Sequence, residues 1–266
     1  MDRPTWAPQG IDLEKASAAR IYDFFLGGSH NFEVDRVAGR KAVEILPDLP
    51  KIAQANRAFI RDAVRQAAAA GVTQFLDIGS GVPTFGNVHE VSLEADPGCR
   101  VVYVDHDPVA VAHSQALLSD VPQASVVEAD LLRPKEILAR VEADGLLDLN
   151  RPVALLLVAV MHFIPESAEP YGLVAELRDA LAPGSLLVLS HATQDGRPEE
   201  AARIERLYSG VGTPFTMRTR EQVERFFEGF VPEPGVLMLG EWGDNAHAAG
   251  DDPARFSGYV GVGRKP

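Results

Sequence analysis

From residue 72 onward, short runs of aliphatic and β-branched residues alternate with longer helical stretches. The runs lie at residues 74–78, 100–104, 125–128, 153–160, 186–190, 236–239 and 258–263. Helical stretches separate the first five runs, and this alternation predicts a parallel β-sheet with helices on both faces. The run at 153–160 is apolar almost throughout, which is typical of a strand that is buried on both sides.

The last two runs are separated only by residues 241–256, which lack the pattern of a crossover helix. Strands joined without such a helix pair in the antiparallel sense, so these two are predicted to form a hairpin at one edge of the sheet. The pattern as a whole predicts an α/β, Rossmann-like fold with a seven-stranded, mostly parallel sheet.

Residues 11–70 contain no convincing strand, and their apolar residues recur at helical spacing. Helices are predicted around residues 13–24, at 36–46 and at 56–70, where Gly71 ends the third one. We therefore expect residues 1–70 to form a helical cap on a Rossmann-like domain of residues 71–266, with both parts in one compact unit.

The first two predicted helices are separated by a break that contains the pair Gly27-Gly28. Tyr22 precedes this pair, and Asn31 and Phe32 follow it. Hinge glycines beside aromatic and amide groups are typical of a lid over a small-molecule site, so we expect Tyr22 or Asn31 to reach the ligand. Two adjacent glycines favour the lid, because a purely structural turn does not need both. The alternative is a packed helix–turn–helix element with a glycine at a helix end.

The first strand leads directly into a glycine turn that contains Asp77, Gly79 and Gly81. Glycines allow the backbone to turn sharply at the carboxyl end of a strand and allow a ligand to lie against it. The next helix is predicted to begin at Asn87, which forms a capping pattern with Glu90. Taken alone, this segment is also compatible with a tight turn that binds nothing.

Acidic residues follow the next two strands as well. Asp105 lies 24 positions after Gly81, close to the spacing at which a carboxylate meets the hydroxyls of a ribose. Asp107 precedes a proline and is predicted to cap a helix instead. Asp130 ends the third strand, and three strands ending in Asp predict a nucleoside-sized crevice. His106 and Leu131, which directly follow Asp105 and Asp130, join the candidates for cofactor binding.

The choice of cofactor depends on two residues. A dinucleotide site would need a third glycine to pack its helix against the strand, and Thr84 stands where that residue is expected. S-adenosylmethionine has no pyrophosphate, and its ammonium group needs a carboxylate that Asp77 can supply directly or through water. These residues favour S-adenosylmethionine over NAD.

These positions belong to a combination of motifs that resembles a bacterial S-adenosyl methyltransferase family once catalogued as a domain of unknown function. The shared residues are Ala19-Arg20-Ile21-Tyr22-Asp23, Gly27-Gly28, Asn31-Phe32, Ala55-Asn56-Arg57, Asp77-Ile78-Gly79-Ser80-Gly81, Pro83-Thr84, Asn87-Val88-His89-Glu90 and Val104-Asp105. A looser resemblance continues through residues 182–184, 219–221 and 259–263. The resemblance implies the class I methyltransferase fold and cofactor binding by Asp77, Gly79, Gly81, Asp105 and Asp130. It implies no substrate.

Composition and charge indicate the compartment and the partners that we expect for the protein. A single cysteine, Cys99, excludes an intrachain disulfide, and no signal sequence or run long enough to span a bilayer is visible. We therefore expect a cytoplasmic protein without a membrane partner. The net charge of −13 argues against nonspecific binding to nucleic acid. The histidines are scattered, so no metal site is predicted.

The catalytic chemistry is the part that the sequence describes least. His162 follows the fourth strand, where it could act as a general base toward a methyl acceptor. The alternative is a partly buried histidine with one backbone hydrogen bond, and His191 has the same ambiguity. The expected activity is transfer of a methyl group from S-adenosylmethionine to a small molecule. The alternatives are a noncatalytic protein that binds the cofactor and a nucleotide-dependent oxidoreductase.

Overall fold

The computed structural model describes residues 12–83, 86–210, 212–250 and 252–266. Five parallel strands form the centre of one sheet: β1 (Gln74–Ile78), β2 (Arg100–Asp105), β3 (Ala124–Glu128), β4 (Ala154–Val158) and β5 (Leu186–Ala192). The strand order is β3-β2-β1-β4-β5-β8-β6, and β8 (Gly258–Arg264) is antiparallel to β5. The order reverses between β1 and β4, so a crevice is expected beyond the carboxyl ends of these strands.

The sheet has eight strands rather than the seven predicted. The predicted hairpin is confirmed, because β7 (Leu237–Met238) pairs antiparallel with β8. A further short strand, β6 (Val231–Pro232), pairs with the other end of β8. The chain between these two pieces contains Pro234, which has no N–H to donate to a neighbouring strand. The outer strand is therefore divided in two.

Helices cover both faces of the sheet, as predicted. The crossovers are α4 (Val88–Ala95), α5 (Pro108–Leu117), α6 (Pro134–Asp144) and α7 (Pro170–Asp179). Neighbouring residues of β1 enter different cores, Phe75 on one face and Leu76 on the other, and every residue of β4 is buried. Two-sided burial of this kind explains the continuous apolar runs in the sequence.

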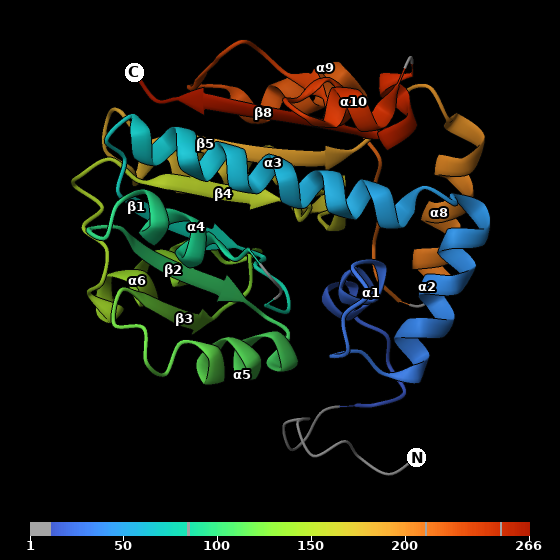
Figure 1. Cartoon of the computed structure of the whole chain (residues 1–266), viewed down its shortest axis with the longest axis horizontal. Coiled ribbons are helices and arrows are strands. Elements are labelled where there is room, and N and C mark those ends of the chain that lie inside the picture. Colours follow the sequence, from blue (N-terminus) through green and yellow to red (C-terminus); the bar gives the residue numbers. More distant parts are fainter. Residues whose placement is uncertain (1–11, 84–85, 211, 251) are drawn as a thin grey trace.

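The amino-terminal helices are α1 (Ala18–Phe25), α2 (Glu33–Ile45) and α3 (Leu49–Ala69). The third begins seven residues earlier than predicted, because Pro50 occupies its first turn, where proline is well tolerated. α3 lies along the sheet (Figure 1), and its Phe59 and Ala63 belong to the same core as Phe75. The division into a cap of residues 1–70 and a domain of residues 71–266 stays a prediction.

A group of helices stands beyond the carboxyl ends of the parallel strands. In Figure 1 the arrowheads of β4 and β5 point toward α8 (Pro198–Gly210), and α1 and α2 lie below it. Ile21 and Phe25 of α1 share a core with Ile204 and Tyr208 of α8. The remaining helical elements are α9 (Arg220–Glu224), α10 (Asn245–Ala249), η1 (Met161–Phe163), η2 (Glu166–Ala168), η3 (Arg225–Phe227), η4 (Leu239–Glu241) and η5 (Pro253–Phe256).

No helix in the described part of the chain is both long enough and apolar enough to cross a membrane.

Candidate active site

A cavity of about 660 Å³ lies between the carboxyl ends of the strands and helices α1 and α3. Its volume falls within the range of small-molecule sites. With the single exception of Asn31, all the site residues predicted from the sequence line it: Tyr22, Asp77, Gly79, Gly81, Asp105, His106, Asp130, Leu131 and His162. We call the part bounded by Asp77, Asp105 and Asp130 the carboxylate end of the cavity.

The glycine turn after β1 has the conformation that its sequence predicts. Gly79 and Gly81 have φ angles of +75° and +69°, in the left-handed region that favours glycine. A Cβ atom at Gly79 would lie 2.4 Å from Val160 Cγ2, whereas one at Gly81 would meet nothing within 4 Å. Gly79 therefore allows close packing against the chain after β4, and Gly81 leaves open space on the cavity side.

Asp105 is buried at the end of β2, and both of its carboxylate oxygens accept backbone hydrogen bonds. Oδ2 accepts from Gly81 N at 2.7 Å, and Oδ1 accepts from Asp107 N at 2.8 Å. Burial raises the pKa of Asp105, and these two backbone donors oppose that rise. A carboxylate has about four lone-pair sites, so Asp105 can accept further hydrogen bonds from a ligand.

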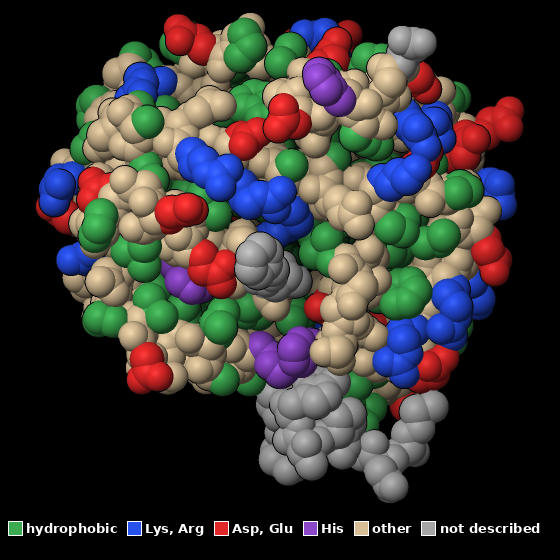
Figure 2. All heavy atoms as spheres, in the orientation of Figure 1, with side chains coloured by type: hydrophobic (Ala, Val, Ile, Leu, Met, Phe, Trp, Pro, Cys, Tyr) green, Lys and Arg blue, Asp and Glu red, His purple; other side chains and the backbone are tan. Residues whose placement is uncertain are grey.

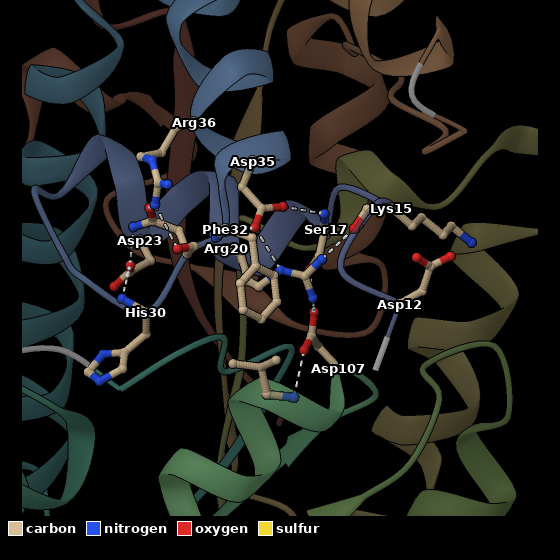
Figure 3. Close-up of polar contacts among 12 residues, drawn as sticks. Asp12, Lys15, Ser17, Arg20, Asp23, His30, Phe32, Asp35, Arg36 and Asp107 are labelled. Atoms are coloured by element: carbon tan, nitrogen blue, oxygen red, sulfur yellow. Dashed lines mark hydrogen bonds and ion pairs between the residues drawn. The ribbon is translucent and has the colours of Figure 1, made fainter. Parts of the chain in front are cut away.

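Asp107 caps α5, as predicted, because its Oδ1 accepts from Val109 N at 2.8 Å. It has a second function that the sequence did not reveal. Arg20 Nη1 lies 3.0 Å from Asp107 Oδ2, and Arg20 Nε lies 2.8 Å from Asp35 Oδ2. Figure 3 shows the guanidinium between the two carboxylates, with Ser17 beside them. This Arg20 network (Arg20, Asp35 and Asp107) is buried and attaches α1 and α2 to the turn that follows Asp105.

The glycine pair has a structural explanation. Gly27 has a φ of +78°, and a Cβ at Gly28 would lie 1.9 Å from Asp23 Oδ1. Asp23 Oδ2 accepts from His30 N at 3.0 Å and from Asn31 Nδ2 at 2.7 Å (Figure 3). Each glycine is thus required by the turn itself, and the argument that a structural turn would not need both was wrong.

Asn31 is not among the residues that line the cavity, so the structure does not bring it together with the other predicted site residues, and its contact with the cofactor stays a prediction. Its Nδ2 donates to Asp23 and, at 2.9 Å, to Gly28 O, while its Oδ1 accepts from Arg36 Nη1 at 3.1 Å. These bonds use the amide to hold the turn after α1. Sequence spacing could not show this, because Asn suits a turn as well as a ligand site.

Tyr22 does line the cavity, as the lid hypothesis predicts for α1. Its hydroxyl donates to Ala53 O at 3.2 Å and accepts from Asn56 Nδ2 at 2.9 Å. Asn56 Oδ1 in turn accepts from Ser190 Oγ at 2.7 Å. Burial raises the pKa of Tyr22, so the hydroxyl stays protonated. These bonds connect α1 through α3 to β5.

Asp77 and Arg57 both line the cavity at its carboxylate end. Burial raises the pKa of Asp77 to about 7, and the charge of Arg57 opposes this rise. Arg57 donates from Nη2 to Gly86 O at 3.0 Å, but its buried Nε has no hydrogen-bond partner among the described residues. Arg57 was missed as a site residue, although Ala55-Asn56-Arg57 is among the motifs that carry the family resemblance.

The opposite part of the cavity is aromatic. His162 and Phe163 of η1 line it together with Tyr208 of α8 and Phe215, and we call this part the aromatic end. The ring centroids of Phe215 lie 4.8 Å from His162, 5.3 Å from Phe163 and 4.7 Å from Tyr208. Burial lowers the pKa of His162 well below its ordinary value, so the ring is neutral.

Arg218 lies behind the aromatic end and is fully buried. It donates to Met161 O at 3.0 Å, to Ile164 O at 2.9 Å and to His191 Nε2 at 2.8 Å, and it pairs with Glu166. It fixes the chain on both sides of His162. No sequence pattern indicates this role, because a single arginine in a predicted loop is indistinguishable from a surface residue.

The remaining predicted positions lie at the edges of the cavity. The His106 side chain is 78 % exposed, and Asp130 accepts from Leu132 N at 2.9 Å while Leu131 is buried. Thr84, which supported the choice of cofactor, lies outside the described residues. Among the described residues, no three His, Cys, Asp or Glu side chains gather in a group that could hold a metal ion.

The S-adenosyl methyltransferase family model matches residues 4–266. The chain belongs to the S-adenosyl methyltransferase family. It is therefore an S-adenosylmethionine-dependent methyltransferase, and S-adenosylmethionine is its cofactor, as predicted from the strand-end residues. This membership excludes the oxidoreductase alternative and supports an enzyme over a noncatalytic binding protein.

Solved structures agree with this assignment. A DUF574 family protein from Streptomyces avermitilis MA-4680 is 40% identical, with a TM-score of 0.90 over 96% of this chain and 99% of that one. A protein from Thermobifida fusca YX is 37% identical, with a TM-score of 0.90 over 98% and 99% of the two chains. The N-methyltransferase NodS from Bradyrhizobium japonicum WM9, solved with S-adenosyl-L-homocysteine, shares the fold at 14% identity, with a TM-score of 0.51 over 79% and 87%. A search of curated proteins gives no match.

Proposed function

We propose that the methyltransferase binds S-adenosylmethionine at the carboxylate end of its cavity and methylates a small organic molecule held at the aromatic end. The observation that carries this proposal is the continuity of the cavity. Asp105 and His162 line the same space of about 660 Å³. One cavity can thus hold a nucleoside-sized ligand and an acceptor side by side.

The carboxylate end suits the nucleoside part of the cofactor. Asp105 has lone pairs left for the two ribose hydroxyls, since each of its oxygens accepts only one backbone hydrogen bond. Gly81 leaves room beside the backbone that a side chain would fill. Asp130 and Leu131 lie at the end of the next strand, where they can border the adenine.

Asp77 and Arg57 suit the amino-acid part of the cofactor. Asp77 can accept from the ammonium group, and the unpartnered Nε of Arg57 can donate to the carboxylate. Without a ligand, the buried carboxyl group of Asp77 holds its proton up to a pH of about 7. A cation placed against it would favour the ionised form.

The chemistry that the cofactor supplies is an electrophilic methyl group on a positively charged sulfur. The protein contributes alignment, because such a transfer depends mainly on holding the nucleophile in line with that methyl group. Tyr22 and α1 cover the cavity on one side, so the acceptor must be small enough to enter beneath them. Figure 2 shows a short row of basic side chains near the centre of the face, with acidic side chains around it. The net charge of −13 does not favour a nucleic-acid acceptor.

Substitutions at two glycines with the same left-handed backbone conformation test the cofactor site. Gly81 and Gly145 have φ angles of +69° and +74°, and a Cβ at either would meet nothing within 4 Å. Gly81→Ala and Gly145→Ala should therefore destabilise the protein equally, by about 1 kcal/mol. In calorimetry with S-adenosyl-L-homocysteine, Gly81→Ala should weaken binding at least tenfold, whereas Gly145→Ala should not. Equal affinities of the two variants would contradict the proposed site.

We also propose a cytoplasmic location, in agreement with the buried free thiol of Cys99. Fractionation of cells that express the tagged protein tests this location.

A further inference from the structure

Among the described residues, the elements that carry the rings of the aromatic end contribute no charged side chain to the cavity lining. The lining residues that belong to β5, η1, α8 and segment 212–215 include histidines, aromatics and aliphatics, but no carboxylate, ammonium or guanidinium group. All the charged lining residues lie on the other elements. Arg218 is completely covered, and its charge is compensated by Glu166. A ligand at this end therefore loses its hydration without gaining an ion pair, which favours an uncharged molecule.

The rings that line the aromatic end form one contiguous cluster. Phe163, Tyr208 and Phe215 contact one another at centroid distances of 4.7 to 6.0 Å, and His162 joins them at 4.5 Å from Phe163. Aromatic side chains pack best against other aromatic groups in stacked or edge-to-face geometry. The shape and chemistry of the aromatic end thus favour a flat, aromatic acceptor.

The hydrogen bonds around Ala192 determine which nitrogens of the two histidines carry hydrogen. His191 Nδ1 lies 2.7 Å from Ala192 O, so Nδ1 donates, and Nε2 accepts from Arg218. His162 Nδ1 instead accepts from Ala192 N at 3.4 Å. Since the His162 ring is neutral, its hydrogen must then be on Nε2.

No residue in the described part of the chain forms a hydrogen bond with His162 Nε2, while the ring lines the cavity. This nitrogen is the polar group that His162 offers to an acceptor molecule. In the tautomer that Ala192 selects, Nε2 donates a hydrogen bond and cannot remove a proton. His162 is therefore suited to orient an oxygen atom.

We propose that the acceptor is an uncharged aryl alcohol and that His162 Nε2–H donates a hydrogen bond to its oxygen, which becomes methylated. This inference rests on the proposed function. The aryl hydroxyl first releases its proton to water. An oxygen lone pair then forms the new C–O bond while the methyl–sulfur bond breaks, and that electron pair remains on sulfur. The products are an aryl methyl ether and S-adenosyl-L-homocysteine.

Four probes with the same ring system test the chemical class: 2-naphthol, naphthalene, 2-naphthoate and 2-naphthylmethylammonium. Each is titrated into protein saturated with S-adenosyl-L-homocysteine. We expect 2-naphthol to bind at least tenfold more tightly than the other three. A charged probe that binds as tightly, or no detectable binding of 2-naphthol, would overturn the inference. Because saturation with S-adenosyl-L-homocysteine is measured first, failure of the cofactor site is recognised separately.

Transfer of radiolabelled methyl from S-adenosylmethionine to 2-naphthol tests the acceptor atom and the role of His162. His162→Gln retains an N–H donor and has no titrating group, whereas His162→Leu has neither. If His162 donates, the methyl-transfer rate of the Gln variant should stay within about tenfold of that of the original protein and should increase with pH in the same way. The rate of the Leu variant should fall at least 100-fold. Exposed His247 provides the control variant His247→Gln. Equal losses in the Gln and Leu variants would indicate a general base instead, and tight binding without any transfer would refute the acceptor atom.

Discussion

The two ends of the cavity are built in different ways. At the carboxylate end, Asp77 and Asp105 lie in the last residues of β1 and β2, and Asp130 follows β3 in the same parallel sheet, so their positions follow from the strand order. At the aromatic end, η1 follows β4, whereas α8 and segment 212–215 follow β5. These elements line the same cavity because the folded chain brings them together, and no shared local motif places them there. The comparison shows that one fold can combine a binding region defined by local motifs with one defined by long-range packing.

The two ends also differ in their electrostatics. Burial raises the pKa of Asp77 to about 7, so a cationic ligand at the carboxylate end would favour its ionised form, whereas two backbone donors oppose the rise in the pKa of Asp105. Burial lowers the pKa of His162 and brings that of His191 to about 3, so the aromatic end stays neutral at all ordinary pH values. This difference agrees with our proposal that the first end binds the charged cofactor and the second an uncharged acceptor.

The largest expected effect concerns the framework of the aromatic end. Arg218→Met leaves Met161 O, Ile164 O and His191 Nε2 without their donor, and should lower the free energy of unfolding by about 3–5 kcal/mol. Arg140→Met is the control, since Arg140 is 50% exposed and pairs only with Glu136. It should cost less than about 1 kcal/mol in urea denaturation. Similar midpoints for both variants would show that the aromatic end does not depend on its buried cation.

The second prediction concerns the stability that the protein loses when the buried carboxyl group of Asp77 ionises. The folded state keeps a proton on Asp77 between pH 3.8 and about 7 that the unfolded state releases. The free energy of unfolding should therefore fall as pH rises through this window, by up to about 4 kcal/mol. Asp77→Asn should remove this part of the pH dependence and also weaken binding of S-adenosyl-L-homocysteine. An unchanged pH profile in urea denaturation would mean that Asp77 ionises normally.

A third, smaller effect distinguishes the carboxylate at the end of β2, Asp105, from Asp107 two residues later. Asp105→Asn should weaken binding of S-adenosyl-L-homocysteine by about 1.5–3 kcal/mol, the range for hydrogen bonds to a charged group. Asp107→Asn should change the affinity less than about threefold. It should instead lower stability by about 2–3 kcal/mol, because the Arg20 network loses one of its two carboxylates. Calorimetry and urea denaturation of both variants distinguish these outcomes, and a reversal would exchange the assigned roles.

The smallest effect concerns Tyr22. Tyr22→Phe keeps the ring but removes the hydroxyl that bonds Ala53 and Asn56, so stability should fall by about 0.5–1.5 kcal/mol. The affinity of the Phe variant for S-adenosyl-L-homocysteine should stay within threefold of the original value. Tyr22→Ala also removes the ring and should reduce the affinity more than threefold. If the Phe variant loses as much affinity as the Ala variant, the hydroxyl rather than the ring contacts the ligand.

Local patterns in the sequence were enough to predict the five parallel strands, the glycine turn and the capping function of Asp107. Strand alternation, left-handed glycines and helix caps are local properties, and parallel strands place their carboxyl ends together without further information. The outer strand was harder to predict, because pieces of two residues such as β6 have no periodicity to detect.

The partners of groups that are distant in the chain depend on how the chain packs. Arg20 meets Asp107 across 87 positions, and Arg218 meets Glu166 across 52. The same applies to Asn31, whose amide is used by Asp23 and Arg36 rather than by the cavity. A polar side chain has the same sequence signature whether it binds a ligand or a neighbouring turn. Only the packed chain determines which donors and acceptors lie within reach, and that geometry assigned Asp105 to the cavity and Asn31 to the fold.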